Sequence, residues 1–321
     1  MKYSLGIDIG GTNISAGVVN SSFEIISRSK VKTNADRPYE QVLEDVIRSG
    51  REAVASAGLS LSDMDWIGIG CPGTCNGDTG YVEYANNMHW ENVPLRLDAE
   101  KAFGVTAYFD NDANAAAFGE YVAGAAKGAK NAVVITIGTG LGAGIIIDGR
   151  IYAGSNFAGA EIGHTVISVD GPECTCGRKG CFEAFSSATA LIRITKEFMD
   201  RNPGSVLHTI AEQDGKISAR TAFKGAKQGD KTAKEAVDYY IKHLACGIAN
   251  VINIFQPDIL CIGGGVSNEG DNLLIPLKKL VEKEIYSKNS KKNTEIAICR
   301  LGNDAGIIGA ALLGKNIIGR I

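Results

Sequence analysis

A glycine-rich hairpin occurs twice in the chain, and this internal repeat constrains the fold more than any other feature. The first copy joins the apolar run 3–9 to the run 14–19 through the turn Gly10-Gly11-Thr12-Asn13. The second joins residues 132–137 to residues 143–147 through the turn Gly138-Thr139-Gly140-Leu141-Gly142. Short apolar runs bounded by glycine are typical of buried strands. A hairpin that returns at such a distance predicts two related domains that each begin with the same element.

The remaining elements are consistent with this arrangement. Apolar residues along one side predict a helix over 39–57 and a longer helix over 232–255, which stops before Pro257. Buried strands are predicted at 66–70 and 259–262, and a final helix at about 304–313. Strands that alternate with helices indicate an α/β protein with mixed sheets flanked by helices. The length of 321 residues fits two domains of about 150 residues each.

Composition excludes several kinds of partner. Lys and Arg number 33 against 36 Asp and Glu, and the densest basic stretch, 288–292, is short. Nucleic acid is therefore not expected as a partner. The first eight residues reach glycine and Asp8 too early for a signal peptide, and no apolar run approaches the roughly 20 residues of a membrane span. We expect a cytoplasmic protein with no membrane partner.

The two glycine-rich turns are candidate phosphate sites. Glycine and threonine can present backbone N–H groups and a hydroxyl to phosphate oxygens without a side chain in the way. A third glycine-rich turn, 263–265, follows the predicted strand 259–262. The three turns could hold the β-phosphate, the γ-phosphate and the adenosine of a nucleotide. Asp8 directly precedes the first turn, where a carboxylate could hold Mg²⁺ or could simply cap the turn.

Asp112 lies at the start of an alanine-rich segment that predicts a helix. Aspartate is a favoured N-cap residue, which stabilises a helix by about 1 kcal/mol. The same position favours the ionised carboxylate, which could accept a proton from a hydroxyl group. Phosphoryl transfer to a sugar requires an acceptor of this kind. This motif taken alone decides neither role.

The most specific motif combines a histidine with three closely spaced cysteines. Glu161-Ile162-Gly163-His164 is followed by Cys174, Cys176 and Cys181. One His and three Cys make a complete tetrahedral ligand set, which predicts a structural zinc site. Glycines at 177 and 180 allow the chain to fold tightly around a metal, which disfavours idle thiols. A hydrolytic zinc is disfavoured, because four protein ligands leave no position for water. A nucleic-acid zinc finger is also disfavoured, because no basic helix follows the cysteines.

Together these motifs resemble those of the sugar-kinase/actin/Hsp70 ATPase superfamily. Residues 8–13 match its first phosphate loop and residues 138–144 its second. The Glu-x-Gly-His element joined to Cys-x-Cys-Gly-x-x-Gly-Cys-x-Glu is similar to that of the ROK family (repressors, open reading frames and kinases). This resemblance covers essentially the whole chain and is nearest to the bacterial glucokinases.

The resemblance implies two ribonuclease H-like domains of the actin-like ATPase type, with the active site in the cleft between them. The smaller domain is expected to span 1–114 and to be joined by the C-terminal helix 303–321. The larger domain, 115–302, is expected to carry the zinc site. A homodimer is typical of relatives.

The resemblance further implies ATP-dependent phosphorylation of a hexose, with D-glucose converted to glucose 6-phosphate as the preferred expectation. Asp112 would be the base that takes the proton from the 6-hydroxyl. Sugar contacts are implied for Gly73, Asn86, Asn111, Asp112, Glu161, His164 and Glu183. Contacts to ATP and Mg²⁺ are implied for Asp8, Gly10, Gly11, Thr12, Asn13, Gly138, Thr139, Gly140, Gly142, Gly264 and Gly265. The ligands implied for structural Zn²⁺ are His164, Cys174, Cys176 and Cys181.

Other functions share much of this pattern. Kinases for N-acetylmannosamine, fructose, allose and N-acetylglucosamine have the same framework, and the sequence leaves the choice of hexose open. A sugar-responsive repressor of the family would carry a helix-turn-helix domain ahead of the first loop, and Asp8 leaves no space for one. A zinc-stabilised sugar-binding module without catalysis is the third alternative.

Overall fold

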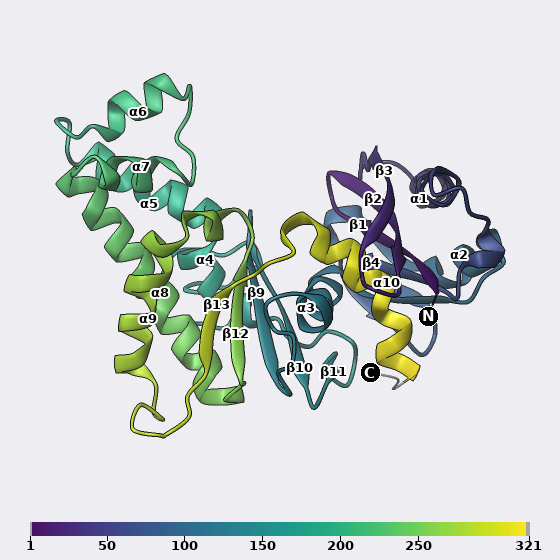
Figure 1. The fold of residues 1–321 in the computed structure, drawn as a ribbon. Helices are drawn as coiled ribbons and strands as arrows, with labels where there is room; N and C mark the ends of the chain where they lie inside the picture. The colour runs from purple at the N-terminus through teal and green to yellow at the C-terminus, as the bar shows by residue number, and fades with distance from the viewer. Residues whose placement is uncertain (1, 319–321) are drawn as a thin grey trace. The chain divides into compact units, whose positions relative to one another are not determined.

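The computed structural model describes residues 2–318, the last two of them as backbone only. The chain divides into two compact units (Figure 1). Unit 1 comprises Met1–Val134, Gly144–Ala160 and Cys299–Ile321, and unit 2 comprises Ile135–Ala143 and Glu161–Ile298. Both units combine strands with helices, which confirms the predicted α/β class. The predicted boundary after residue 114 stays a prediction, and the end of the helix predicted to run to 321 lies outside the described residues.

Unit 1 is built on a five-stranded mixed sheet with the order β3-β2-β1-β4-β8. The strands β1 (Tyr3–Ile9), β2 (Asn13–Asn20) and β3 (Ile25–Lys32) are antiparallel neighbours. The strands β4 (Ile67–Cys71) and β8 (Ala107–Asn111) run parallel to β1. The carboxyl ends of β1, β4 and β8 therefore meet at one edge of the sheet.

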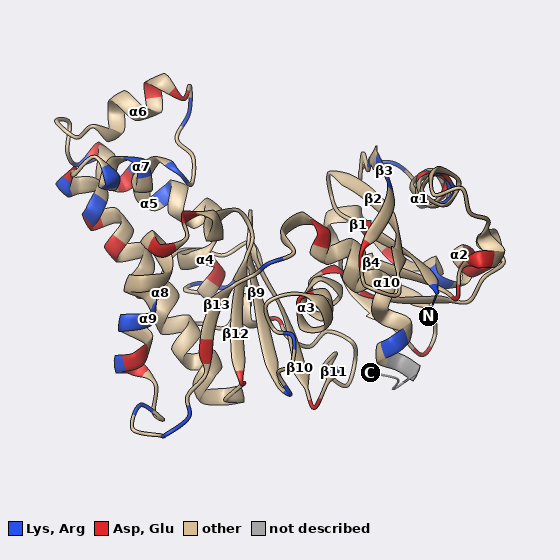
Figure 2. Ribbon diagram, viewed as in Figure 1, with Lys and Arg blue, Asp and Glu red and all other residues tan. Residues whose placement is uncertain are grey.

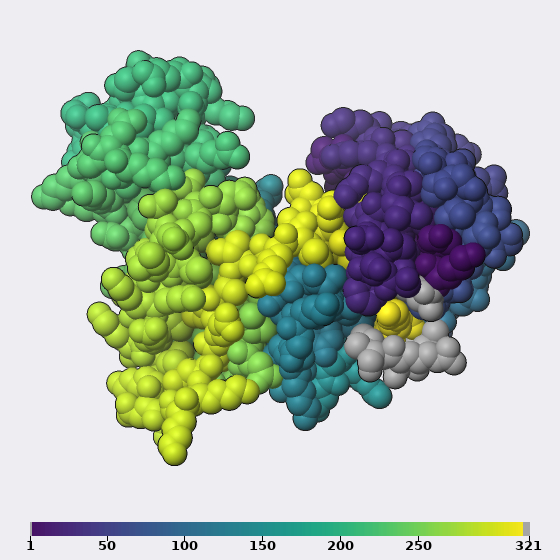
Figure 3. Space-filling view, in the orientation of Figure 1, coloured from purple at the N-terminus to yellow at the C-terminus, as the bar shows by residue number. Residues whose placement is uncertain are grey.

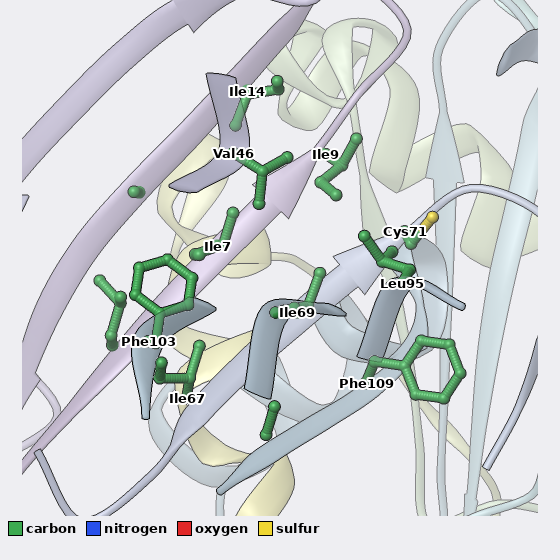
Figure 4. Packing of buried hydrophobic residues seen from close by; sticks show 14 of the residues in the cluster. Ile7, Ile9, Ile14, Val46, Ile67, Ile69, Cys71, Leu95, Phe103 and Phe109 are labelled. Atoms are coloured by element: carbon green, nitrogen blue, oxygen red, sulfur yellow. The ribbon is translucent and has the colours of Figure 1, made fainter. Parts of the chain in front are cut away.

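Helices cover both faces of this sheet. These helices are α1 (Tyr39–Ser56), α2 (Leu95–Phe103), α3 (Asp112–Ala123) and α10 (Ala305–Ile318). Side chains alternate along a strand, so neighbouring residues of β1 face opposite sides. Leu5 packs against Gly50 of α1, whereas Gly6 lies against the carbonyl oxygen of Ile307 in α10. The apolar core on the α1 side includes Ile7, Val46, Ile69 and Phe103 (Figure 4).

Close contact between α10 and its neighbours depends on small residues. A Cβ atom built on Gly68 would lie 1.7 Å from the carbonyl oxygen of Ala310, and one on Gly309 would lie 1.7 Å from that of Ala115. Any larger side chain at these two positions would push α10 away from β4 or from α3. The helix α10 therefore packs tightly against both β4 and α3.

A three-stranded antiparallel sheet extends unit 1. It contains β5 (Thr74–Asn76), β6 (Tyr81–Ala85) and β7 (Trp90–Val93), with the 3-10 helix η2 (Asn86–Met88) between the last two. A further 3-10 helix, η1, spans Leu61–Asp63, and η5 spans Gly302–Asp304. Residues 73 and 86 both belong to the segment between β4 and α2 that forms this small sheet.

The second five-stranded sheet has the order β11-β10-β9-β12-β13. Its strands are β9 (Ala132–Ile137), β10 (Leu141–Ile147), β11 (Arg150–Ile151), β12 (Ile259–Gly263) and β13 (Glu295–Ile298). The predicted second hairpin is confirmed, because β9 and β10 are adjacent and only three residues connect them. The last two strands, β12 and β13, are parallel.

Unit 2 carries most of the helices. They are α4 (Phe182–Ser186), α5 (Ala188–Asp200), α6 (Leu207–Gln213), α7 (Thr221–Lys227), α8 (Lys231–Phe255) and α9 (Asp271–Glu284), with 3-10 helices η3 (Ile162–His164) and η4 (Gly265–Glu269). The predicted long helix is α8, whose C-cap Gln256 is left-handed and precedes Pro257. Residues of α6 and α7 project at one end of α8 (Figure 3).

The buried side of α8 holds α4 in place. The ring of Phe182 packs directly on Gly247, and the hydroxyl of buried Tyr240 donates to the carbonyl oxygen of Ser186 at 2.7 Å. Acidic and basic residues are mixed along the outer parts of α8 and α9 (Figure 2). Among the described residues, no helix has both the length and the apolar character that crossing a membrane requires.

Candidate active site and metal centre

Three acidic residues of unit 1 gather where the parallel strands end. In the sheet register Asp8 of β1 pairs with Gly70 of β4, and Gly70 pairs with Asp110 of β8. A Cβ atom on Gly70 would lie 3.8 Å from Oδ1 of Asp8 and 3.6 Å from Cα of Asp112. The missing side chain of Gly70 therefore leaves space between Asp8 and Asp112. The carboxyl ends of parallel strands are a common location for ligand sites in α/β proteins.

The environment of Asp8 disfavours its negative charge. Burial, and to a lesser extent the nearby charge of Asp112, raise the pKa of Asp8 from its ordinary value to about 7. The first turn of α10 also contacts this carboxylate, since a Cβ atom on Gly306 would lie 2.5 Å from Oδ2. Sequence reasoning did not identify Gly306, because residues 8 and 306 are brought together only by the fold. A cation bound here would favour the ionised form of Asp8.

The predicted cap of α3 is wrong by one residue. Asn111 is the N-cap, and its side-chain oxygen accepts from the backbone N–H groups of Ala113 at 2.9 Å and Asn114 at 3.3 Å. Asn111 is the last residue of β8 and has a non-helical ψ of 143°, so the first helical residue is Asp112. The cap role therefore belongs to Asn111. Asp112 lies in the first turn of α3, where the helix dipole favours a carboxylate.

Asp110 and Asn111 connect this edge to the neighbouring loop. Burial raises the pKa of Asp110 to about 6, although hydrogen bonds from the Asn114 side chain and the Asn111 backbone oppose the shift. The side-chain amide of Asn111 donates to the carbonyl oxygen of Gly73 at 3.2 Å. The structure thus brings Gly73, Asn111 and Asp112 together, as a shared role in one sugar site requires.

Asn86 is exposed at the start of η2, on the small sheet. Its side-chain oxygen accepts from the hydroxyl of Tyr84 at 3.0 Å. The carbonyl oxygen of Tyr84 in turn lies against Gly73, where a Cβ atom would approach to 2.1 Å. Gly73 has a φ of 95°, a conformation that favours glycine. Asn86 is therefore connected to Gly73 through Tyr84.

The first predicted phosphate loop is a tight turn between β1 and β2. The N–H of Gly10 donates to the carbonyl oxygen of Asn13 at 2.9 Å. Thr33 supports the turn from outside, since its hydroxyl donates to Gly10 and its N–H donates to Thr12. Gly11 has open space where a side chain would be. Sequence reasoning missed Thr33, for which the sequence gave no local signal.

The second predicted phosphate loop joins β9 to β10 in unit 2. The N–H of Gly138 donates to the carbonyl oxygen of Gly140 at 3.0 Å, which closes the turn. The N–H of Leu141 donates to Oε2 of Glu183 at 2.8 Å. Gly264 has a φ of 84° and lies against the backbone of Ile137, where a Cβ atom would approach to 2.3 Å. Gly264 and Gly265 are therefore beside the end of β9, next to this loop.

The predicted metal ligands form one cluster in unit 2. The ligand atoms of His164, Cys174, Cys176 and Cys181 all lie within 4.8 Å of one another. The Sγ of Cys174 is 3.6 Å from Nδ1 of His164, and the Sγ atoms of Cys176 and Cys181 are 3.7 Å apart. A tetrahedral zinc site has edges of about 3.6 Å between N and S and about 3.8 Å between two S atoms. The four donors therefore fit Zn²⁺.

The two ring nitrogens of His164 face different groups. Nδ1 faces the cysteines, whereas Nε2 is 3.9 Å from the carboxylate of Glu161. The carboxylate of Glu183 accepts from the hydroxyl of Thr175, which lies between two of the cysteine ligands, at 3.2 Å. The three side chains predicted to contact sugar from this unit, Glu161, His164 and Glu183, thus all adjoin the metal cluster.

Comparison with known proteins places these features in a family. The model of the ROK family matches residues 4–317. The chain belongs to the ROK family. Glucokinase from Thermotoga maritima is 38% identical over 320 residues, which cover 98% of each chain.

Other relatives are similar over most of their length. The crystal structure of a ROK family glucokinase from Streptomyces griseus, in complex with glucose and AMPPNP, superposes with a TM-score of 0.81 at 34% identity. It covers 97% of this chain and 98% of that one. A putative xylose repressor from a Caldicellulosiruptor species is 31% identical, over 96% of this chain and 77% of its own length. Proteins similar to this chain therefore include both glucokinases and a putative repressor.

Proposed function

We propose that this ROK protein is an ATP-dependent hexose kinase that converts D-glucose to glucose 6-phosphate. The observation that carries the proposal is the placement of Asp112 beside Asp8, at one edge of the sheet and next to the first glycine-rich turn. One carboxylate can accept a proton there while the other holds a cation. The glucokinases of Thermotoga maritima and Streptomyces griseus support the choice of glucose.

Asp112 is the proposed base. Its carboxylate accepts the proton of the sugar 6-hydroxyl while that oxygen forms a bond to the γ-phosphorus of ATP. The bond from the γ-phosphorus to the β,γ-bridging oxygen breaks, and its electron pair leaves with ADP. Asn111 caps α3, which fixes the helix turn that carries Asp112. Catalysis then depends mainly on positioning and on neutralisation of phosphate charge.

Asp8 is the proposed residue for Mg²⁺, directly or through water, and a cation bound there would neutralise charge at the phosphates. The remaining nucleotide contacts are proposed for Gly10, Gly11, Thr12 and Asn13 in unit 1, and for Gly138, Thr139, Gly140, Gly142, Gly264 and Gly265 in unit 2. Turns of this composition bind phosphate through backbone N–H groups.

The proposed sugar contacts are Gly73, Asn86, Asn111 and Asp112 in unit 1, and Glu161, His164 and Glu183 in unit 2. Zn²⁺ bound to His164, Cys174, Cys176 and Cys181 would be structural, because four protein donors complete a tetrahedral set. The metal would fix Nδ1 of His164, which leaves Nε2 to bind a sugar hydroxyl. The zinc would therefore orient the sugar site and take no part in the chemical step.

We propose a cytoplasmic homodimer that takes part in glycolysis and has no nucleic-acid partner. The mixed distribution of acidic and basic residues along α8 and α9 agrees with this last point (Figure 2). Sedimentation at several protein concentrations would test the dimer.

A sugar panel tests the proposed reaction. ADP release from ATP is measured with glucose, fructose, allose, mannose, N-acetylglucosamine and N-acetylmannosamine, and kcat/KM values are compared. Glucose should give the highest value. A higher value with an N-acetylhexosamine would keep the kinase assignment and overturn the choice of sugar, whereas no turnover with any of them would overturn the kinase.

A sugar-sensing regulator is the second candidate function, and the 31% identity to a putative xylose repressor is the observation that favours it. A regulator would bind sugar without sugar-dependent release of ADP. Binding alone requires neither a proton acceptor nor a cation site, so the adjacent carboxylates of Asp8 and Asp112 favour the kinase.

A further inference from the structure

The start of α5 contacts the second phosphate loop at two consecutive peptide groups. The N–H of Ala188 donates to the carbonyl oxygen of Gly138 at 2.9 Å. The hydroxyl of Thr189 donates to the carbonyl oxygen of Thr139 at 2.8 Å. All four residues belong to unit 2. The first N–H groups of a helix have no acceptor within the helix, so Ala188 can use its own for the loop.

These two bonds determine which way the loop's N–H groups point. A trans peptide group is planar, and its C=O and N–H point in opposite directions. Because α5 holds the carbonyl groups of Gly138 and Thr139, the N–H groups of Thr139 and Gly140 must point away from α5. Within residues 2–318, no acceptor is found for either N–H group. Two successive N–H groups that point the same way form an anion-binding concavity.

The two peptide groups that flank Leu141 are each held by a segment that carries metal ligands. The N–H of Leu141 donates to Glu183 in α4, which begins directly after Cys181. The carbonyl oxygen of Leu141 lies against Gly163, the residue before His164, where a Cβ atom would approach to 2.3 Å. Leu141 is therefore fixed in place, and the N–H groups of Thr139 and Gly140 are the two that point away from α5.

We propose that Thr189 is a positioning residue for the phosphoryl donor, which orients the N–H groups of Thr139 and Gly140 toward a phosphate group of the nucleotide. This inference rests on the proposed function, because it assumes that the loop 138–142 binds ATP. Thr189 acts through Thr139 and touches neither sugar nor metal ligands in the proposed site. The sequence did not single out Thr189, which reads there as an ordinary residue in the first turn of a helix.

The variant Thr189→Val tests this role, because it keeps the shape of the side chain and removes the hydroxyl donor. Binding of the non-hydrolysable analogue AMPPNP with Mg²⁺ is measured by calorimetry on zinc-loaded protein, without sugar. Loss of one neutral hydrogen bond corresponds to a weakening of about two- to tenfold. The matched control Thr189→Ser keeps the hydroxyl and should restore wild-type affinity.

Two further readouts separate positioning from stability. Thr189 is exposed at the start of α5, so the melting temperature of Thr189→Val should stay close to that of the wild type. The affinity for glucose without nucleotide should also be unchanged, while the KM for ATP rises. Zinc content is measured in every sample to show that the metal cluster is intact.

The outcomes distinguish this inference from the proposed function. Wild-type affinity for AMPPNP in Thr189→Val would overturn the role of Thr189 while the kinase assignment stands. Equal weakening in Thr189→Ser and Thr189→Val would also overturn it, because the hydroxyl would then not be the cause. A wild-type protein that binds no AMPPNP at all would refute the kinase itself.

Discussion

At the scale of single residues, the carboxylates at the end of the first sheet differ in what surrounds them. Asp8 and Asp110 lie largely away from water, and burial is the main reason that their pKa values rise to about 7 and about 6. Asp112 lies at the start of α3, where the dipole of the helix stabilises a negative charge. Two of the three carboxyl groups at this sheet edge therefore have raised pKa values, as groups at functional sites often do.

The first prediction concerns the proposed base. Asp112→Asn should lower kcat by about 10²–10⁴-fold, because an amide cannot accept the hydroxyl proton. The Kd for glucose should change little, since the side chain keeps its size. A coupled assay of ADP release and calorimetry with glucose measure the two quantities. Asp238→Asn, on the exposed side of α8, is the control, and near-normal turnover of Asp112→Asn would rule out this base.

The second prediction follows from the raised pKa of Asp110. Folding favours its protonated form, so its contribution to stability is most favourable below about pH 4, declines as the pH rises to about 6, and then stays level. Asp110→Asn does not titrate there. The free energy of unfolding of the wild type should therefore fall relative to the variant across this window, by on the order of 1–3 kcal/mol. Urea unfolding at several pH values measures it, and a constant difference would contradict the assignment.

At the scale of elements, α10 illustrates how the last helix becomes part of the first half of the chain. Gly6 of β1, Gly68 of β4 and Gly309 of α10 allow the backbone of α10 to approach β1, β4 and α3 directly. Its first turn then reaches Asp8, which makes the C-terminal segment part of the environment of the site. The sequence predicts the helix from its apolar residues, but the glycines alone do not show which neighbours require them.

The third prediction concerns this contact. Gly309→Ala should destabilise the protein by about 1–3 kcal/mol, because the added Cβ would meet the carbonyl oxygen of Ala115 at 1.7 Å and force α3 and α10 apart. Gly204→Ala is the control, since nothing lies within 4 Å of its Cβ position and its φ is not positive. Thermal unfolding compares the two variants. An equally stable Gly309→Ala protein would show that the helices are not in such close contact.

The fourth prediction concerns the metal cluster. Removal of Zn²⁺ with a chelator should increase hydrogen exchange in residues 161–183 and abolish sugar binding, because this segment has little secondary structure of its own to maintain it. Readdition of Zn²⁺ is the control and should restore both. A protein shown to be free of metal that binds glucose normally would refute this account of the cluster.

At the scale of the whole molecule, the residues proposed to act in the reaction are distributed over both units. Unit 1 holds Asp8, Asn111 and Asp112, and unit 2 holds the metal cluster and the second phosphate loop. Similarity to relatives extends over both units, since the ROK family model matches residues 4–317. A function that uses residues of both units therefore requires the chain as a whole.

The fifth prediction tests binding to the folded protein directly. At a concentration about 100 times its Kd, D-glucose should stabilise the folded state by about 2.7 kcal/mol and raise the melting temperature. L-glucose is the control, because its mirror-image hydroxyls cannot make the same contacts. Scanning calorimetry measures both, and equal effects of the two sugars would indicate that no specific sugar site exists.

The sequence by itself determined the repeated hairpin, several of the strands and helices, and the grouping of one histidine with three cysteines, whose ligand atoms the structure brings together. These features depend on local patterns, such as the apolar run 132–137 or the spacing of Cys174, Cys176 and Cys181. Such patterns can be recognised without knowledge of distant residues. Cap positions were less accessible, because Asn111 and Asp112 are both good caps and only the backbone angles decide between them.

Only the tertiary structure decided which distant residues surround the site. Asp8 and Gly306 touch although almost the whole chain separates them, and Thr189 holds Thr139 although neither belongs to a motif that suggests it. The raised pKa values of Asp8 and Asp110 depend on burial, which only packing creates. Contacts between remote segments arise from the complementary shapes of packed elements. A local sequence pattern does not show which elements are complementary.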